Sequence, residues 1–273
     1  MNGKARLAGS PFRWGPGLIN IAVITLIIFA ASFLPSDTSL SQLRKSGILK
    51  VCAPYDAAPL VTSDPNQPGY DIELLAEAAS RLGLRLSINR NPAIGADFNA
   101  RNWGITRSQC ELVAGGVIDT PATRGFLHTV PTDIETGWVM IAKPGDMPAL
   151  AGSRVGILPG ASGLDRTALS RVLRAENVDT SLIRAPAQLR ESIENDTIDF
   201  GITDRFSAAR IADGLNIVWL THPDLPRYSL AIGGWKGDSS LHRALRKQFG
   251  DMRDDGTLRA IRDRYALGEP ESG

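Results

Sequence analysis

The amino-acid sequence predicts an α/β fold of two lobes, each a mostly parallel sheet flanked by helices. Apolar runs of strand length alternate with segments of helical periodicity, which is typical of parallel sheets layered with helices. The alternation runs through two cycles, each of roughly 80 to 130 residues, the usual size of a domain. The chain crosses between the cycles near residues 143–147 and 221–227. We therefore expect a two-strand hinge with a ligand cleft between the lobes.

Composition excludes several function classes. The chain has 273 residues, and its 30 basic and 29 acidic side chains leave a formal net charge of +1. This balance, with no basic cluster interleaved with aromatic residues, argues against nucleic acid as a partner. The three histidines and two cysteines have no metal-ligand spacing, so neither a metal nor another cofactor is expected.

Residues 1–35 are expected to be a signal peptide or a signal anchor. Basic residues precede the apolar run 18–34, and the small residues Ala30 and Ser32 fit a cleavage site near Ser32. The run approaches the ~20 residues that a membrane-spanning helix needs, so an uncleaved anchor is the alternative. Either case places the rest of the chain outside the cytoplasm, in the periplasm.

The first lobe is expected over residues 36–143 and 228–267. Its best-defined element is a helix from Asp71 to Leu82, because apolar residues recur there at helical spacing, Asp71 suits an N-cap and Gly83 suits a C-cap. Residues 54–68 are rich in proline and predict a loop. The other expected elements are strands over 48–53, 84–88, 112–114, 137–142 and 228–232, a weak helix within 99–108, and helices over 240–253 and 258–265.

The second lobe is expected over residues 144–227, followed by the first lobe's return and a tail at 268–273. Apolar residues on one face predict a helix over 164–175, after a loop of small residues. The other expected elements are strands over 154–158, 181–184, 198–203 and 216–220 and helices over 188–195 and 206–213.

The stretch from Cys110 to Arg124 is the first candidate site. A short apolar strand ends at two glycines, and a loop with Asp119 and Thr120 leads to Arg124. Loops after the carboxyl ends of parallel strands bind ligands in open α/β sheets, and an arginine there can hold a carboxylate in a two-pronged grip. The alternative is a surface loop whose arginine pairs with a neighbouring aspartate.

Five motifs in order give the chain a family resemblance over residues 48–267. They are Gly69–Leu75 (GYDIELL), Cys110–Gly116 (CELVAGG) followed by Thr120, Pro121 and Arg124, Arg154–Gly163 (RVGILPGASG), Ile198–Asp204 (IDFGITD) and Asp255–Ile261 (DGTLRAI) with Tyr265. Together they resemble the periplasmic solute-binding proteins of ABC importers, especially the polar amino acid-binding group, extracellular solute-binding protein family 3. The resemblance implies the two-lobed periplasmic-binding-protein fold (type 2).

The resemblance also implies the ligand site. An arginine like Arg124 grips the ligand α-carboxylate, with donors from the second-lobe loop around Ala161 and Ser162, and an aspartate like Asp204 pairs with the ammonium. A zwitterion buried in a closed cleft needs both charges compensated, because unpaired burial is unfavourable. The remaining candidates are the loop residues Asp119 and Thr120 and the aromatic residues Phe98 and Tyr55.

The sequence departs from the family pattern at the ligand loop. One extra residue separates Pro121 from Arg124, and Ile118-Asp119 stands where the family usually has threonine. Asp119 either accepts from a ligand ammonium or opposes a carboxylate near Arg124. In the first loop, Leu60 replaces an aromatic residue, which leaves Tyr55 as the nearest stacking surface.

The implied function is that of a non-enzymatic, monomeric substrate-binding component of an ABC importer, which carries a small polar, amino acid-like solute to an inner-membrane permease. One alternative is an accessory or sensory protein of a periplasmic dehydrogenase or receptor system. Another is a periplasmic dehydratase-type enzyme on the same fold, with Glu135, Asp119 and His128 as its acid–base candidates.

The two cysteines, Cys52 and Cys110, are both expected in the first lobe on neighbouring strands. An exported protein meets oxidising conditions, so a disulfide fits the expected compartment. Neighbouring buried strands seldom offer suitable Cβ geometry, and two separate core thiols are an equally good prediction.

Overall fold

The computed structural model describes residues 15–32, 37–95, 97–146, 149–159, 164–211 and 213–268. The chain divides into two compact units, Met1–Asp37 and Thr38–Gly273. In the first unit, α1 (Gly15–Ser32) exposes apolar side chains such as Ile19 and Ile27. Within the described part of the chain, no helix is both long enough and apolar enough to cross a membrane. Of the expected tail, only Gly268 is described.

The second unit contains two five-stranded sheets. The first has the order β2-β1-β3-β10-β4, with parallel pairing among its first three strands and antiparallel pairing of β10 with both neighbours. Two of its four pairings are therefore parallel, so the sheet is mixed. Its strands are β1 (Ile48–Ala53), β2 (Arg85–Arg90), β3 (Leu112–Ile118), β4 (Leu127–Thr136) and β10 (Tyr228–Trp235).

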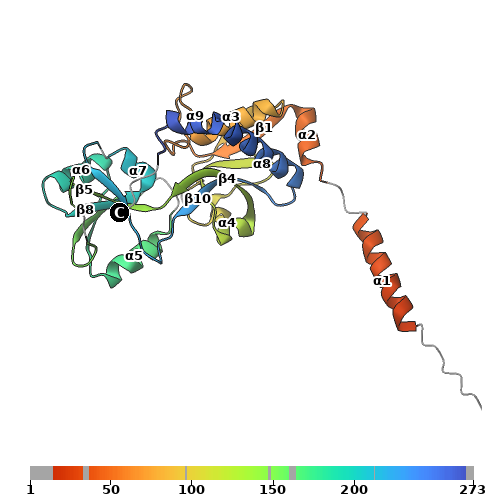
Figure 1. Ribbon diagram of the computed structural model, residues 1–273, viewed down its shortest axis with the longest axis horizontal. Helices are drawn as coiled ribbons and strands as arrows, with labels where there is room; N and C mark the ends of the chain where they lie inside the picture. The colour runs from red at the N-terminus through yellow and green to blue at the C-terminus, as the bar shows by residue number, and fades with distance from the viewer. Residues whose placement is uncertain are drawn as a thin grey trace, which may run out of the picture. The chain divides into compact units, whose positions relative to one another are not determined.

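Helices cover both faces of the first sheet (Figure 1). The side chains of successive β3 residues point to opposite faces of the sheet. Leu112 packs in the core cluster that includes α3 and α8. Val113 packs with Trp103 and Leu127 on the other face. The helices of this part are α2 (Ser39–Ser46), α3 (Tyr70–Arg81), the 3₁₀ helix η1 (Ala100–Trp103), α4 (Pro121–Phe126), α8 (Ser239–Asp254) and α9 (Thr257–Arg264).

The second sheet has the order β7-β6-β8-β5-β9 and is also mixed, because β6 is parallel to β7 and β8 while β5 is antiparallel to β8 and β9. Its strands are β5 (Trp138–Ala142), β6 (Arg154–Ile157), β7 (Asp179–Leu182), β8 (Phe200–Asp204) and β9 (Asn216–Trp219), and its helices are α5 (Arg166–Ala175), α6 (Pro186–Glu194) and α7 (Arg205–Ala209). The predicted fold class, two helix-flanked sheets in one α/β chain, is confirmed.

Two strands differ from the sequence prediction. The predicted strand at 137–142 was assigned to the first lobe, but β5 pairs with β8 and β9 of the second sheet, so the chain crosses at Gly137. Periodicity identifies a strand without saying which sheet it joins. Strand β4 was missed because Pro131 interrupts its pattern. Proline is tolerated there since β4 lies at the edge of the sheet.

A buried carboxylate ties helix α3 to strand β3. The Gly115 amide donates to Oδ2 of Asp71 at 2.8 Å, and the Asp71 side chain is buried. Gly115 has φ of 92°, and a Cβ at this position would lie 2.3 Å from Cδ of Pro54. A side chain at position 115 would therefore collide with Pro54 and strain the backbone, so glycine is required where the strand amide binds Asp71.

Burial raises the pKa of Asp71 to about 7, although the amides of Gly115 and Gly116 act in the opposite direction. Between about pH 4 and pH 7 the folded protein then binds more protons than the unfolded chain, so stability falls as pH rises, by up to about 1.4 kcal/mol per unit. Asp71→Asn keeps an oxygen for the Gly115 amide and should remove this slope. Urea unfolding of both proteins at pH 5, 6, 7 and 8 measures how the free energy of unfolding depends on pH. The same pH dependence in both proteins would show that Asp71 is not the titrating group.

Candidate functional site

Helix α4 sets the direction of Arg124. Thr120 caps the helix by accepting from the Thr123 amide at 3.1 Å, and Pro121 occupies the first turn. This start buries Thr123 and leaves the Arg124 side chain 57% exposed. One residue rotates a side chain by about 100° around a helix. With the helix starting at this cap, Thr123 faces inward and Arg124, one residue further around the helix, faces outward.

Arg124 lies beside Asp119. Its Nε is 3.5 Å from Oδ1 of Asp119, and the same carboxylate oxygen accepts from the Thr129 hydroxyl at 2.7 Å. The backbone amide of Asp119 donates to the Ser229 carbonyl at 2.9 Å, which fixes the loop against β10. The alternative that the sequence predicts, an arginine paired with a neighbouring aspartate, is thus present in the structure.

The ion pair lines a cavity of about 310 Å³ that is rich in basic groups. His128 accepts from an Arg246 guanidinium at Nε2, 3.1 Å away. Because arginine has no acceptor, the neutral His128 ring carries its proton on Nδ1. Burial, and then the Arg246 charge, lower the pKa of His128. The lining residues are Asp119, Arg124, Leu127, His128, Thr129, Pro131 and Lys236.

Asp204, the last residue of β8, is the N-cap of helix α7. Its Oδ1 accepts from the backbone amides of Phe206 at 3.0 Å and Ser207 at 3.3 Å, which caps α7, and the residue is fully buried. The Asp204 carboxylate is thus engaged by the start of α7.

Asp204→Ala should lower the free energy of unfolding by about 1–2 kcal/mol, because it leaves two amides of α7 without their cap. Asp204→Asn keeps the capping oxygen and should cost less. Urea unfolding of both variants tests the cap. Equal losses for alanine and asparagine would show that the charge, and not the cap, sets the stability.

Two aromatic residues of the first lobe meet near a carboxylate of the second. The rings of Phe98 and Tyr228 lie 6.2 Å apart in an edge arrangement. Burial, and then the charge of Asp165, raise the pKa of Tyr228. Asp165 caps α5 in the second lobe through the amides of Thr167 and Ala168. The charge of Asp165 on α5 thus acts on Tyr228 at the start of β10.

The family model for bacterial extracellular solute-binding proteins, family 3, matches residues 49–269. The chain belongs to this family. The resemblance that the five motifs predict is confirmed.

Solved structures show the same fold for this family 3 protein. An ancestral amino acid-binding protein, described as a precursor of cyclohexadienyl dehydratase, is 18% identical with a TM-score of 0.60, over 83% of this chain and 99% of that one. A substrate-binding protein of an ABC uptake transporter from Streptococcus pneumoniae, with bound histidine, is 16% identical with a TM-score of 0.60, over 84% and 96%.

A curated relative is the membrane-bound lytic murein transglycosylase F of Cronobacter sakazakii, 22% identical over 267 residues. The match covers 90% of this chain and 49% of the relative. The family 3 chain thus spans about half the length of the transglycosylase that it matches.

The structure brings some of the predicted site residues of this family 3 protein together. Arg124 and Asp119 line one cavity beside Thr129, and Thr120 caps the helix that carries Arg124. Tyr55 is 61% exposed, and no described contact joins it to Phe98. Ala161 and Ser162 lie outside the described residues.

Sequence reasoning missed Tyr228, Lys236 and the contribution of β4. Tyr228 opens β10 directly after the second crossover, and Lys236 follows the same strand. Both residues lie at the ends of β10, the strand by which the chain re-enters the first sheet, and this position could have marked them as candidate site residues. Of the acid–base candidates, Asp119 and His128 line the same cavity, whereas Glu135 is an exposed residue of β4.

The described residues contain no cluster of three or more histidine, cysteine, aspartate or glutamate side chains suited to a metal ion.

Proposed function

We propose that this protein binds an amino acid or a similar small, carboxylate-bearing solute as the substrate-binding component of an ABC importer. The observation that carries the proposal is the Arg124–Asp119 pair on a cavity of about 310 Å³. A guanidinium beside a carboxylate complements a zwitterion, because each ligand charge meets its opposite. Lys236 on the same cavity adds a second cation for the ligand carboxylate.

The rest of the site comes from the facing lobe. We assign lobe 1 to residues 38–137 and 228–267 and lobe 2 to residues 138–227, following the sheet to which each strand pairs. Asp204 and the loop with Ala161 and Ser162 contribute from lobe 2. Contacts from both lobes favour the closed state once the solute is bound.

Location and partners follow from the same proposal. The matching family is described as extracellular, and basic residues precede the apolar run that becomes α1. We propose export to the periplasm by an N-terminal signal peptide or signal anchor. The protein then acts as a monomer that delivers its solute to an inner-membrane permease.

A thermal-shift screen with the common amino acids and small organic acids tests the function, followed by calorimetry on the compounds that shift Tm. A ligand present at 100 times its Kd adds about 2.7 kcal/mol to the stability. At least one zwitterionic or carboxylate-bearing solute should raise Tm. If amines without a carboxylate raise Tm and no carboxylate does, the proposal is wrong.

A second candidate is a dehydratase, because Asp119 and His128 line the same cavity and one structural neighbour is described as a dehydratase precursor. A neutral imidazole and a carboxylate on one cavity suit proton transfer during an elimination. Incubation with prephenate or arogenate tests this activity. Formation of the dehydrated product would favour an enzyme over a binding protein. An accessory or sensory role would appear instead as solute binding without association with a permease.

A further inference from the structure

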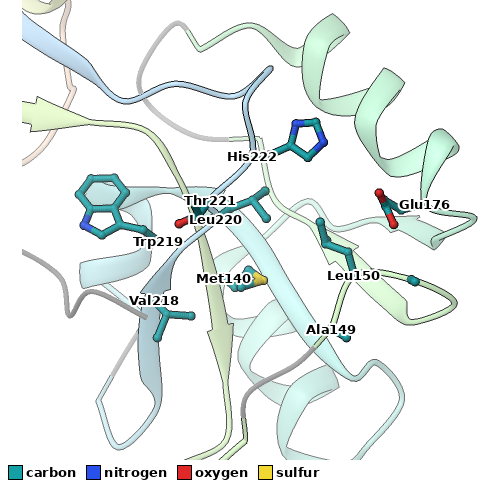
Figure 2. Close-up of a pocket in the computed structure, with 10 residues that line it drawn as sticks. Met140, Ala149, Leu150, Glu176, Val218, Trp219, Leu220, Thr221 and His222 are labelled. Carbon is teal, nitrogen blue, oxygen red and sulfur yellow. The ribbon is translucent and has the colours of Figure 1, made fainter.

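The second lobe contains a larger cavity that none of the predicted ligand residues touches. It measures about 510 Å³ and lies over β5 and β9, at the edge of the second sheet (Figure 2). It shares no lining residue with the Arg124 cavity. Its ten lining residues are Met140, Ala149, Leu150, Ala151, Glu176, Val218, Trp219, Leu220, Thr221 and His222.

The floor of this cavity is apolar. Val218 and Leu220 are buried, and Met140 and Leu150 are half-buried members of the same side of the core. Figure 2 shows Met140 lying between Val218 and Leu150, while the Trp219 ring points away from Leu150 and Glu176. Methionine adapts its shape to irregular apolar groups, so this floor suits an alkyl or aromatic group.

One margin of the cavity is negative. Glu176 stands there, directly after the last residue of the ten-residue helix α5 (Figure 2). The carboxyl end of a helix carries partial negative charge, which adds to that of the Glu176 carboxylate. Among the described residues, no hydrogen bond or ion pair engages this carboxylate. The neighbouring Arg174 lines a separate pocket with Ser170 and Val178.

His222 and Thr221 add polar groups to the lining. Nδ1 of His222 accepts from the Asp224 amide at 3.1 Å, so the neutral ring carries its proton on Nε2. Thr221 adds a hydroxyl. Glu176 is thus the one formally charged group among the ten described lining residues, and the cavity favours a cation.

We propose that this cavity is a second binding site, for an amphipathic organic cation. The apolar part of the ligand rests on Met140, Val218 and Leu220, and its ammonium group faces Glu176. The chemical class follows from the juxtaposition of an apolar floor and an unengaged carboxylate at a helix end. The site does not depend on solute binding at Arg124.

Phenethylammonium is the probe, and phenethyl alcohol is its neutral counterpart of matched shape. In protein labelled with [methyl-¹³C]methionine, phenethylammonium should shift the Met140 resonance in a saturable way. Met252, buried in α8 of the first lobe, should not move and serves as an internal control. The alcohol should bind about three- to tenfold more weakly, as expected for a partly exposed ion pair.

Variants then separate this site from unspecific binding. Glu176→Gln should weaken phenethylammonium binding about three- to tenfold and make it equal to that of the alcohol. Glu191→Gln, at an exposed position of α6, should change nothing. Ala151→Trp, from an exposed position, should fill the cavity and abolish both signals. An unmoved Met140 resonance, or unchanged affinity in Glu176→Gln, would overturn the proposal.

Discussion

Arg124→Gln should weaken binding of a carboxylate-bearing solute about 100-fold, or about 3 kcal/mol. Glutamine removes the charge and the two-pronged geometry but keeps a side chain of similar reach. Because Arg124 is 57% exposed and pairs with Asp119 only at 3.5 Å, the folded state should lose little stability. Titration calorimetry with the solute found by thermal shift measures the loss.

Arg124→Lys sharpens the test, since lysine keeps the charge without the planar fork and should recover only part of the affinity. Arg259→Gln, at an exposed position on α9, is the matched control and should bind as the parent protein does. Asp119→Asn should weaken an amine-bearing solute more than its des-amino analogue. Unchanged affinity in Arg124→Gln would remove this arginine from the site.

Replacing both cysteines, Cys52→Ala with Cys110→Ala, should lower the free energy of unfolding by about 2–4 kcal/mol. Cys52 and Cys110 form a disulfide with their Cα atoms 5.5 Å apart, across a sequence separation of 58 residues. Closing a loop of that length restricts the unfolded chain, and the chain-entropy model gives roughly 4 kcal/mol. Urea unfolding with and without dithiothreitol measures the effect.

The alanine pair provides the control for the disulfide, because its stability should not respond to dithiothreitol. Both sulfur-bearing residues are buried, so reduction of the parent protein requires prior opening and should be slow in the absence of urea. A parent protein whose urea midpoint is the same after full reduction would contradict a stabilising role for the bridge.

The disulfide is an open question in the sequence because predicted strands do not fix the distance between two cysteines that lie far apart in the chain. Both cysteines were expected within neighbouring strands, where bridges seldom fit. In the structure β3 starts at Leu112, and Cys110 precedes the ladder that pairs Val51 with Leu112. The two Cα atoms lie 5.5 Å apart, within the range that a disulfide spans.

The sequence by itself determined the local elements and the family. Helix α3 follows from apolar spacing, although its N-cap is Gly69 and not the predicted Asp71. Strand β3 follows from the apolar run that begins at Leu112, although it continues through Gly115 and Gly116 to Ile118. These features depend on contacts between near neighbours in the chain. Periodicity and turn chemistry encode such contacts directly.

Only the tertiary structure decided the sheet that β5 joins and the side of α4 on which Arg124 lies. The first depends on pairing with β8 and β9, which are more than fifty residues away in the chain. The second depends on where α4 begins, because the Thr120 cap decides which residue of the first turn faces inward. Arg124 lies about 100° around the helix from the buried Thr123 and lines a cavity with Asp119 and Lys236.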